Sequence, residues 1–230
     1  MTDLLTTSLF WLAVTLGVFE ATDTVSKRSG RHPLLHPVLW STPVLIALLL
    51  WTGTPYETYQ QATFPISFLL GPAVVGFAVP IWAQRARIRR LAVPIVLALG
   101  AGAITSIVSA VGILALFGAP REVLASIAPR ATTTPVAMAI AGQLGGVPAL
   151  AAVIVLFAGV IGAMFATPLL NLLKVRDYRA RGFAVGVAAH GIGAARAFQV
   201  DSTAGALASL GMALNAATTA ALLSILALLV

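Results

Sequence analysis

Seven consecutive residues hold the groups best suited to binding a solute. An arginine and three threonines lie between two prolines, in the order Pro129, Arg130, Ala131, Thr132, Thr133, Thr134 and Pro135. The flanking segments are apolar enough to span a bilayer. Proline removes a backbone donor and clashes with the preceding helical turn, so the run predicts a broken helix whose freed backbone groups face a cavity. In membrane transporters, such breaks mark the substrate site.

A second polar stretch lies nearer the C-terminus and carries His190, Gly191, Gly193 and Arg196. A guanidinium binds a carboxylate through two parallel hydrogen bonds, and a helix N-terminus adds a favourable potential. Arg130 and Arg196, with the three threonine hydroxyls, therefore predict a receptor for a small organic anion. Two interpretations compete with it: the threonines cap a broken helix, and the arginines reach from hairpin mouths to lipid headgroups.

His190 is a candidate for proton coupling, because the reference pKa of histidine, about 6.5, suits a proton relay. A histidine that is satisfied by packing is the competing interpretation. Asp201 is a second coupling candidate, and it is also the natural structural partner of Arg196. Asn215 is expected to pack between helices. No cofactor is predicted, and either H+ or Na+ can be the coupling ion.

The composition places these residues in a membrane protein. Hydrophobic residues make up 59% of the 230-residue chain and charged residues 9%, with a mean hydropathy of +0.99, values outside the range of soluble domains. Charge-free runs near or beyond the length of a spanning helix recur along the chain. We therefore predict a single, all-α, polytopic transmembrane domain over residues 1–230, with about six transmembrane helices of roughly 20 residues each.

Absent motifs and the charge distribution narrow the function. The sequence has no cysteine, which excludes disulfides and thiolate metal sites. It has no P-loop, no metal-ligand spacing and no nucleophile elbow, so we expect neither an enzyme nor a primary active transporter. The net charge of +7 does not indicate nucleic acid, because eleven of the fourteen basic residues form three short clusters between apolar segments.

These basic clusters predict the topology. They lie at 27–31, 85–90 and 174–181, and the positive-inside rule places them on the cytoplasmic side of the membrane. Helices are then expected at about 4–25, 33–52, 64–83, 91–118, 148–173 and 203–229. Segment 119–147 must begin and end on the outer side, so it is expected to form a re-entrant hairpin. The alternative is two full crossings, for which this length is short.

The C-terminal part of the chain repeats this design. A hairpin followed by a helix is expected at 119–173, and a second such unit at 182–229 starts from the opposite face. An inverted repeat with paired broken elements is the sequence pattern of transporter sites near the bilayer midplane. Elevator-type sliding and rocking arrangements both use such repeats. A homodimer is expected by analogy alone.

Four segments carry a resemblance to the LrgB/CidB family of antiholin-like bacterial membrane proteins. They are Leu70–Val75, Ile127–Met138, Gly145–Ala149 and Ala189–Arg196. The family typically reads KSVTTPIAM in the second segment and SHGIGTAR in the fourth. Length and motif order match over essentially the whole chain. The family is also similar to the C-terminal part of the plastid glycolate/glycerate translocator of plants.

The chain departs from the family pattern at four of these positions. Arginine replaces the usual lysine at 130, and alanine stands where hydroxyl residues are usual at Ala131, Ala189 and Ala194. The first change keeps the charge but alters the donor geometry. The loss of three hydroxyls indicates a less hydroxylated or a larger solute.

The resemblance implies two competing functions. One is a carrier for small monocarboxylates such as glycolate, glycerate, pyruvate or lactate, with proton coupling. The other is an antiholin-like modulator of a holin-type pore, formed with a small LrgA/CidA-like membrane partner, that affects murein hydrolase activity and lysis. Paired breaks with cationic and hydroxyl groups favour the carrier.

Overall fold

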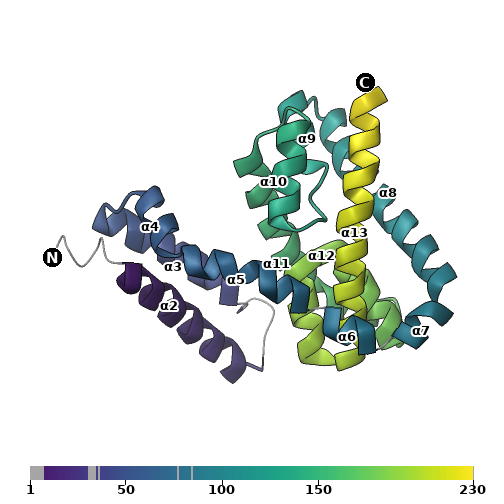
Figure 1. Cartoon of the computed structure of the whole chain (residues 1–230), viewed down its shortest axis with the longest axis horizontal. Helices are drawn as coiled ribbons and strands as arrows, with labels where there is room; N and C mark the ends of the chain where they lie inside the picture. The colour runs from purple at the N-terminus through teal and green to yellow at the C-terminus, as the bar shows by residue number, and fades with distance from the viewer. Residues whose placement is uncertain (1–7, 31–34, 36, 77, 84, 230) are drawn as a thin grey trace. The chain divides into compact units, whose positions relative to one another are not determined.

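The computed structural model describes residues 8–30, 35, 37–76, 78–83 and 85–229. Within these residues it contains helices and no strand (Figure 1). The helices are α2 Ser8–Arg28, α3 Pro37–Thr52, α4 Tyr56–Ala62, α5 Phe64–Gly76, α6 Ala78–Ala83, α7 Arg85–Arg90, α8 Ala92–Leu116, α9 Arg121–Ile127, α10 Thr134–Gln143, α11 Pro148–Leu172, α12 Tyr178–Val200 and α13 Ser202–Leu229. The expected start of the first helix at residue 4 lies outside the described residues, as do the side chains at 70, 71 and 73–75.

Four of the described helices are long and apolar enough to cross a bilayer, namely α2, α8, α11 and α13. Helix α3 is apolar but has 16 residues. The single helix expected over 64–83 is described as two shorter helices, α5 and α6. The all-helical membrane fold is therefore confirmed, and the count of about six spanning helices stays a prediction.

Contacts divide the chain into two compact units, residues 1–78 and 79–230. In the first unit, α2 packs against α3 and α4. Trp11 is 1% exposed and lies edge-on to Tyr59, with ring centroids 5.6 Å apart. Thr15 Oγ1 lies 3.1 Å from the Tyr59 hydroxyl oxygen. The residues predicted to bind the solute all belong to the second unit.

Segment 119–147 is interrupted where its prolines predict. Helix α9 ends at Ile127 and α10 begins at Thr134, with a turn between them. The backbone N–H of Val147, just before α11, donates to Ser126 Oγ over 2.8 Å. Beside this bond Gly146 packs so closely on α9 that a Cβ there would lie 2.8 Å from the Ser126 backbone nitrogen. The end of α9 is thus fastened to the start of α11.

Helix α12 is also broken, at a single residue. His190 has φ +41° and ψ −134°, values that no helix allows. Beyond it the chain doubles back, because a Cβ at Gly193 would lie 2.9 Å from the Val185 carbonyl oxygen, whereas a continuous helix separates such residues by about 12 Å. Helix α12 therefore consists of two half-helices, 178–189 and 191–200. The re-entrant placement of both broken segments and their inverted relation stay predictions.

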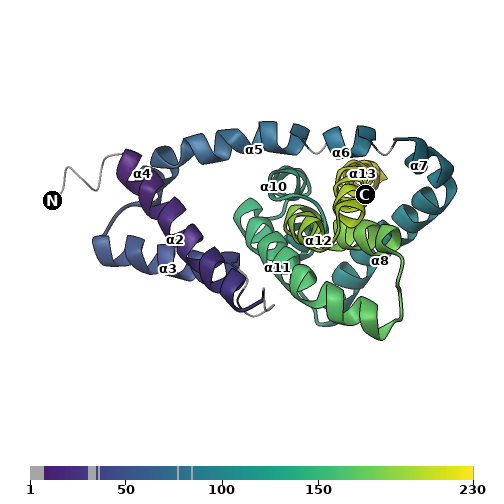
Figure 2. The same cartoon turned by 90° about the horizontal axis from the view of Figure 1, so that it is seen from below.

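Helix α13 packs along both halves of α12, and α12 lies between α11 and α13 (Figure 2). Gly182 touches the backbone of Ala204, and Gly186 touches that of Ala208. Small residues let helix backbones approach this closely inside a membrane. In both contacts the α13 residue follows the α12 residue by the same number of positions, so α13 runs parallel to the first half of α12.

Candidate functional site

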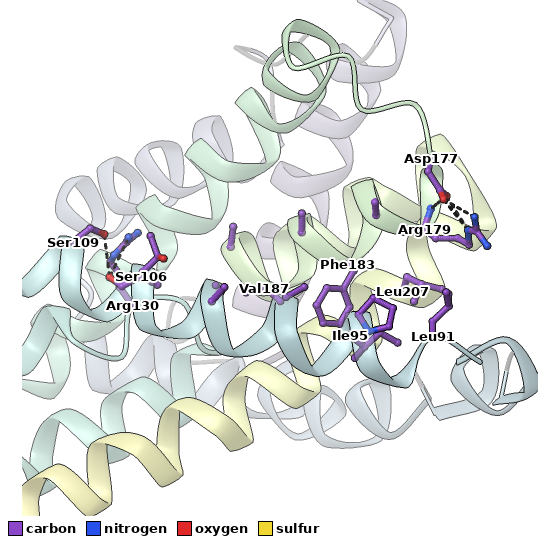
Figure 3. Close-up of a pocket in the computed structure, with 18 residues that line it drawn as sticks. Leu91, Ile95, Ser106, Ser109, Arg130, Asp177, Arg179, Phe183, Val187 and Leu207 are labelled. Carbon is purple, nitrogen blue, oxygen red and sulfur yellow. Dashed lines mark hydrogen bonds and ion pairs between the residues drawn. The ribbon is translucent and has the colours of Figure 1, made fainter. Parts of the chain in front are cut away.

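A cavity of about 680 Å³ lies between α8 and the first half of α12. Its wall is apolar along most of its length, and its charged groups lie at the two ends (Figure 3). The apolar wall includes Ile95, Ala98, Gly102, Phe183, Val187 and Leu207. Cavities of this volume hold ligands of many heavy atoms, so the second unit has room for a solute beside the first broken segment.

Arg130 forms one end of the cavity. Its Nη2 atom lies 3.5 Å from the Ser106 carbonyl oxygen, a long distance for a hydrogen bond. Its Nε atom is buried without a hydrogen-bond partner among the described residues, and Ser106 Oγ is in the same condition. Burying a charge without a compensating partner is costly. This end of the cavity is therefore suited to an anion.

The Arg130 end lies deep within the second unit. Ser106 is about 21 Å along the axis of α8 from Ala92, slightly beyond the middle of this 25-residue helix. If α8 spans the bilayer, Arg130 is near mid-depth. An arginine there needs an anionic partner or water.

Asp177 and Arg179 form the other end of the cavity. Arg179 Nη2 lies 2.6 Å from Asp177 Oδ2, and Arg179 Nε donates to the same carboxylate. These hydrogen bonds hold the pKa of Asp177 below its usual value. Both side chains are nearly half exposed. They belong to the basic cluster at 174–181, so this end of the cavity lies beside the face that the sequence predicts to be cytoplasmic.

The three predicted threonines lie behind Arg130 and are absent from the described lining of the cavity. Thr132 is fully buried, and its hydroxyl donates to the Pro129 carbonyl oxygen over 2.8 Å. Thr133 is the N-cap residue of α10, although its side chain makes no capping hydrogen bond, and Thr134 is the first residue of that helix. The competing interpretation, in which a threonine side chain hydrogen-bonds a free backbone group of the break, therefore holds for Thr132.

His190 has found a structural partner. It is 4% exposed, and its Nε2 atom lies 2.9 Å from the Val155 carbonyl oxygen, so Nε2 must carry the donated proton. The ring also packs on Gly159, where a Cβ would lie 2.5 Å from His190 Cε1. These contacts with α11 stabilise His190 in a backbone conformation that residues other than glycine rarely adopt. Proton coupling through His190 stays a prediction.

The remaining residues of the predicted receptor lie away from Arg130. Gly193 is buried against Val185, and Gly191 lies near Met212. Arg196 donates to Gln199 over 3.2 Å and lines a separate cavity of about 30 Å³. The two arginines therefore line different cavities, and the structure does not form the single receptor that was expected to contain both.

Asp201 caps a helix. Its Oδ1 atom accepts hydrogen bonds from the backbone N–H groups of Thr203 and Ala204, over 2.8 and 2.9 Å. This is the usual role of aspartate before the first turn of a helix. The carboxylate thus has a local structural function at the start of α13, and its part in coupling is still a prediction.

Asn215 links the two broken segments, in agreement with its expected packing role. The side chain is fully buried in α13, and its Nδ2 atom donates to the carbonyl oxygens of Ala131 and Val187, over 2.9 and 3.2 Å. Ala131 lies in the first break, and Val187 lies three residues before His190. One amide group therefore satisfies a backbone acceptor in each of the two broken segments.

Sequence reasoning missed the hydroxyl residues of α8. Thr105, Ser106 and Ser109 line the cavity at the Arg130 end. Their spacing was the available signal, because residues three or four apart share one face of a helix and the rest of α8 is apolar.

The alanines at the positions that depart from the family pattern are buried in helix packing: Ala131, Ala189 and Ala194. They therefore do not support the expectation of a larger solute.

A known protein family accounts for most of the chain. The model of the LrgB-like family matches residues 15–229. The chain belongs to the LrgB-like family. This confirms the resemblance drawn from the two broken segments and their neighbours.

Individual relatives cover most of the chain. The uncharacterized proteins YxaC and YwbG of Bacillus subtilis are 36% identical over 184 residues and 32% identical over 191 residues. These alignments cover 80% of this chain and 80% of YxaC, and 82% of this chain and 85% of YwbG. Holin-like protein CidB of Staphylococcus epidermidis is 29% identical over 199 residues, 86% of this chain and 87% of the relative. No solved structure matches the chain significantly.

Proposed function

We propose that the chain is a holin-like protein that regulates the permeability of a bacterial inner membrane. The observation that carries this proposal is the similarity of the chain to holin-like CidB proteins, since those of Staphylococcus epidermidis and Staphylococcus aureus each align with 86% of the chain. These names favour the antiholin-like alternative over the monocarboxylate carrier that the polar residues alone favour. In this role the chain modulates a pore formed with a small LrgA/CidA-like partner.

The surface of the second unit suits such an assembly. Helix α8 exposes Leu97, Ile104 and Val108, and α11 exposes Phe157 and Ile161. Exposed apolar helix faces bind either lipid tails or the transmembrane helices of another chain, and association of this kind needs no polar contact. A partner helix can therefore replace lipid on these faces.

Induced expression in a bacterium that lacks its own family members tests the role. The chain is expressed alone, with a small LrgA/CidA-like protein, and as a truncated form without α13 that controls for expression load. We expect the complete chain to change the release of a cytoplasmic enzyme and the murein hydrolase activity of the culture. Unchanged release and hydrolase activity in every combination would remove the support for this function.

A second candidate function is a carrier of small organic monocarboxylates, favoured by the geometry at Arg130. A half-buried guanidinium, whose Nε atom has no partner in the part of the chain that the structure describes, ends a solute-sized cavity midway along α8. A pore modulator does not need this arrangement, whereas an anion carrier needs a cation at mid-depth. Glycolate, glycerate, pyruvate and lactate are the substrates implied by the family resemblance, with His190 as the candidate for proton coupling.

Reconstitution in liposomes separates the two functions. A carrier takes up labelled pyruvate or lactate saturably, responds to a proton gradient, and loses this uptake in Arg130→Gln. The matched control is Arg121→Gln, which removes an exposed arginine from α9 in the same broken segment. Leakage of an unrelated trapped dye, equal in both variants, would support the permeability role and reject the carrier.

A further inference from the structure

We propose that the cavity between α8 and α12 binds a monocarboxylate that carries an apolar chain, with its carboxylate at Arg130 and its chain along the wall toward Arg179. The assignment deepens the second candidate function and rests on it only in taking an organic anion as the solute. It names a ligand class that differs from the short hydroxylated acids implied by the family resemblance.

The volume of the cavity is the first reason. At about 30 Å³ per molecule of liquid water, 680 Å³ corresponds to roughly twenty waters. An acid of two or three carbons fills a small fraction of this space. Such a solute would contact only a small part of the apolar wall, so it would gain little from burying apolar surface.

The polarity of the wall is the second reason. Between its two ends the cavity is bounded by aliphatic and aromatic side chains, including Ile95, Phe183 and Leu207, and these three belong to one buried cluster of the second unit. Figure 3 shows them along the stretch between the Arg130 end and the Asp177–Arg179 end. A wall of this kind stabilises methylene groups. The hydroxyl side chains of the lining, Thr105, Ser106 and Ser109, lie at the Arg130 end and not along this wall.

The unpaired polar atoms at the inner end are the third reason. Arg130 Nε and Ser106 Oγ are both buried without a hydrogen-bond partner among the described residues. A carboxylate accepts strong hydrogen bonds from a guanidinium, and Arg130 and Ser106 both line this end of the cavity. The planar fork of arginine is better suited to a carboxylate than the lysine usual at this family position.

The end of the cavity at Asp177 and Arg179 lies at the basic face, and we take it as the mouth through which an anion enters. Arg179 is fastened to Asp177 there, and the neighbouring cluster 174–181 contributes further positive charge. Positive potential at a mouth raises the local concentration of anions. The carboxylate can therefore pass the mouth and bind at Arg130, while the apolar chain occupies the wall behind it.

Equilibrium binding to the full chain in nanodiscs of zwitterionic lipid tests the proposal. The probes are radiolabelled pyruvate, butyrate, hexanoate and octanoate at neutral pH, with binding to empty nanodiscs subtracted. We expect affinity to rise about fourfold for each added methylene until the chain fills the wall. Octanol, which has the same chain without the charge, should compete poorly.

Two variants with matched controls assign the binding to the cavity. Arg130→Gln should weaken octanoate binding about tenfold or more, whereas Arg121→Gln should not change it. Ala98→Phe places a ring in the wall, so it should remove the advantage of octanoate over butyrate. Ala115→Phe, at an exposed position of the same helix outside the cavity lining, should keep that advantage.

Three results would overturn the proposal. Equal affinity for pyruvate and octanoate, lost in Arg130→Gln, would leave the small-acid carrier standing and reject the longer ligand. Octanoate binding that persists in Arg130→Gln would show partition into lipid instead of a site. Octanoate binding that disappears in nanodiscs containing phosphatidylglycerol, and returns in zwitterionic lipid, would assign the cavity to an anionic lipid.

Discussion

The two broken segments of the second unit meet at Asn215 but differ in how their polar groups are satisfied. At the first break, 128–133, a half-buried guanidinium lines the cavity, and its Nε atom has no hydrogen-bond partner among the residues that the structure describes. At the second break, the His190 ring donates to Val155 and packs on Gly159. Similar interruptions of a membrane helix thus have opposite chemistry. The first is ready to receive a ligand, and the second is closed by the protein itself.

This difference separates a binding role from a structural role. A polar group that is satisfied by the protein contributes to stability, and its removal costs free energy. A partly buried charge that is left without a partner lowers stability, and a ligand that pairs with it removes this cost. Stability and ligand binding should therefore respond in opposite ways to substitutions at the two breaks.

The largest effect is expected from filling the space beside the second break. Gly159→Leu forces a side chain against the His190 ring, so it should lower the free energy of unfolding by about 3 kcal/mol. The control is Gly112→Leu on α8, where a Cβ would meet no atom within 4 Å. Thermal unfolding of the purified variants in detergent measures both. Equal midpoints for the two variants would mean that His190 is not packed as described.

A smaller loss is expected from the amide that joins the two breaks. Asn215→Leu leaves the carbonyl oxygens of Ala131 and Val187 without their donor, so stability should fall by about 2 kcal/mol. Asn171→Leu is the control, because Asn171 is an exposed residue of α11 that accepts a hydrogen bond from Arg181 at the surface. Denaturant titration of both variants gives the comparison. A loss no greater than that of the control would contradict the link between the breaks.

The backbone of His190 predicts an unusual order of substitutions. Both His190→Ala and His190→Gly lose the hydrogen bond to Val155, but glycine adopts a positive φ without strain, so the alanine variant should be about 1 kcal/mol less stable. At Ala188, an ordinary helical position two residues earlier, glycine should be the less stable residue by a similar amount. Unfolding midpoints of the glycine and alanine forms at both sites test this reversal. The same order at both sites would show that the break is not at His190.

The smallest effect on stability is expected at the first break. Arg130→Gln removes a charge that has no ionic partner in the described structure and keeps a polar side chain of similar length, so the free energy of unfolding should change by less than about 0.5 kcal/mol. Arg130→Leu, which loses every donor, should behave similarly. Thermal unfolding without added ligand is the measurement. A loss comparable to that of Asn215→Leu would assign Arg130 to the framework.

The sequence predicts the breaks because proline and glycine act locally. Each proline beside Arg130 lacks a backbone N–H donor and restricts the φ and ψ angles of the residue before it. These effects do not depend on the surrounding fold. The glycines after His190 likewise indicate an interruption. Residue types of this kind constrain φ and ψ without reference to the rest of the molecule, so the interruptions of 119–147 and α12 follow from the printed sequence.

The partners of the polar groups could not be predicted in this way. Ser106 lies 24 residues before Arg130 in the chain, and Val155 lies 35 residues before His190. Packing decides which helix faces meet. A close backbone contact such as that of Gly186 with Ala208 involves no charged residue, so the sequence does not reveal it. For the same reason the sequence places Arg196 in one receptor with Arg130, whereas the structure places the two arginines in different cavities.

The most direct test of the contrast between the breaks is ligand-induced stabilisation of three chains. Wild type, Arg130→Gln and His190→Gly are heated in nanodiscs with increasing pyruvate or octanoate, because a ligand that binds the native state raises its unfolding midpoint. The account predicts that His190→Gly begins at a lower midpoint but keeps the ligand response, whereas Arg130→Gln begins near wild type and loses it. A response that survives in Arg130→Gln and vanishes in His190→Gly would contradict the assignment of the ligand site to the first break.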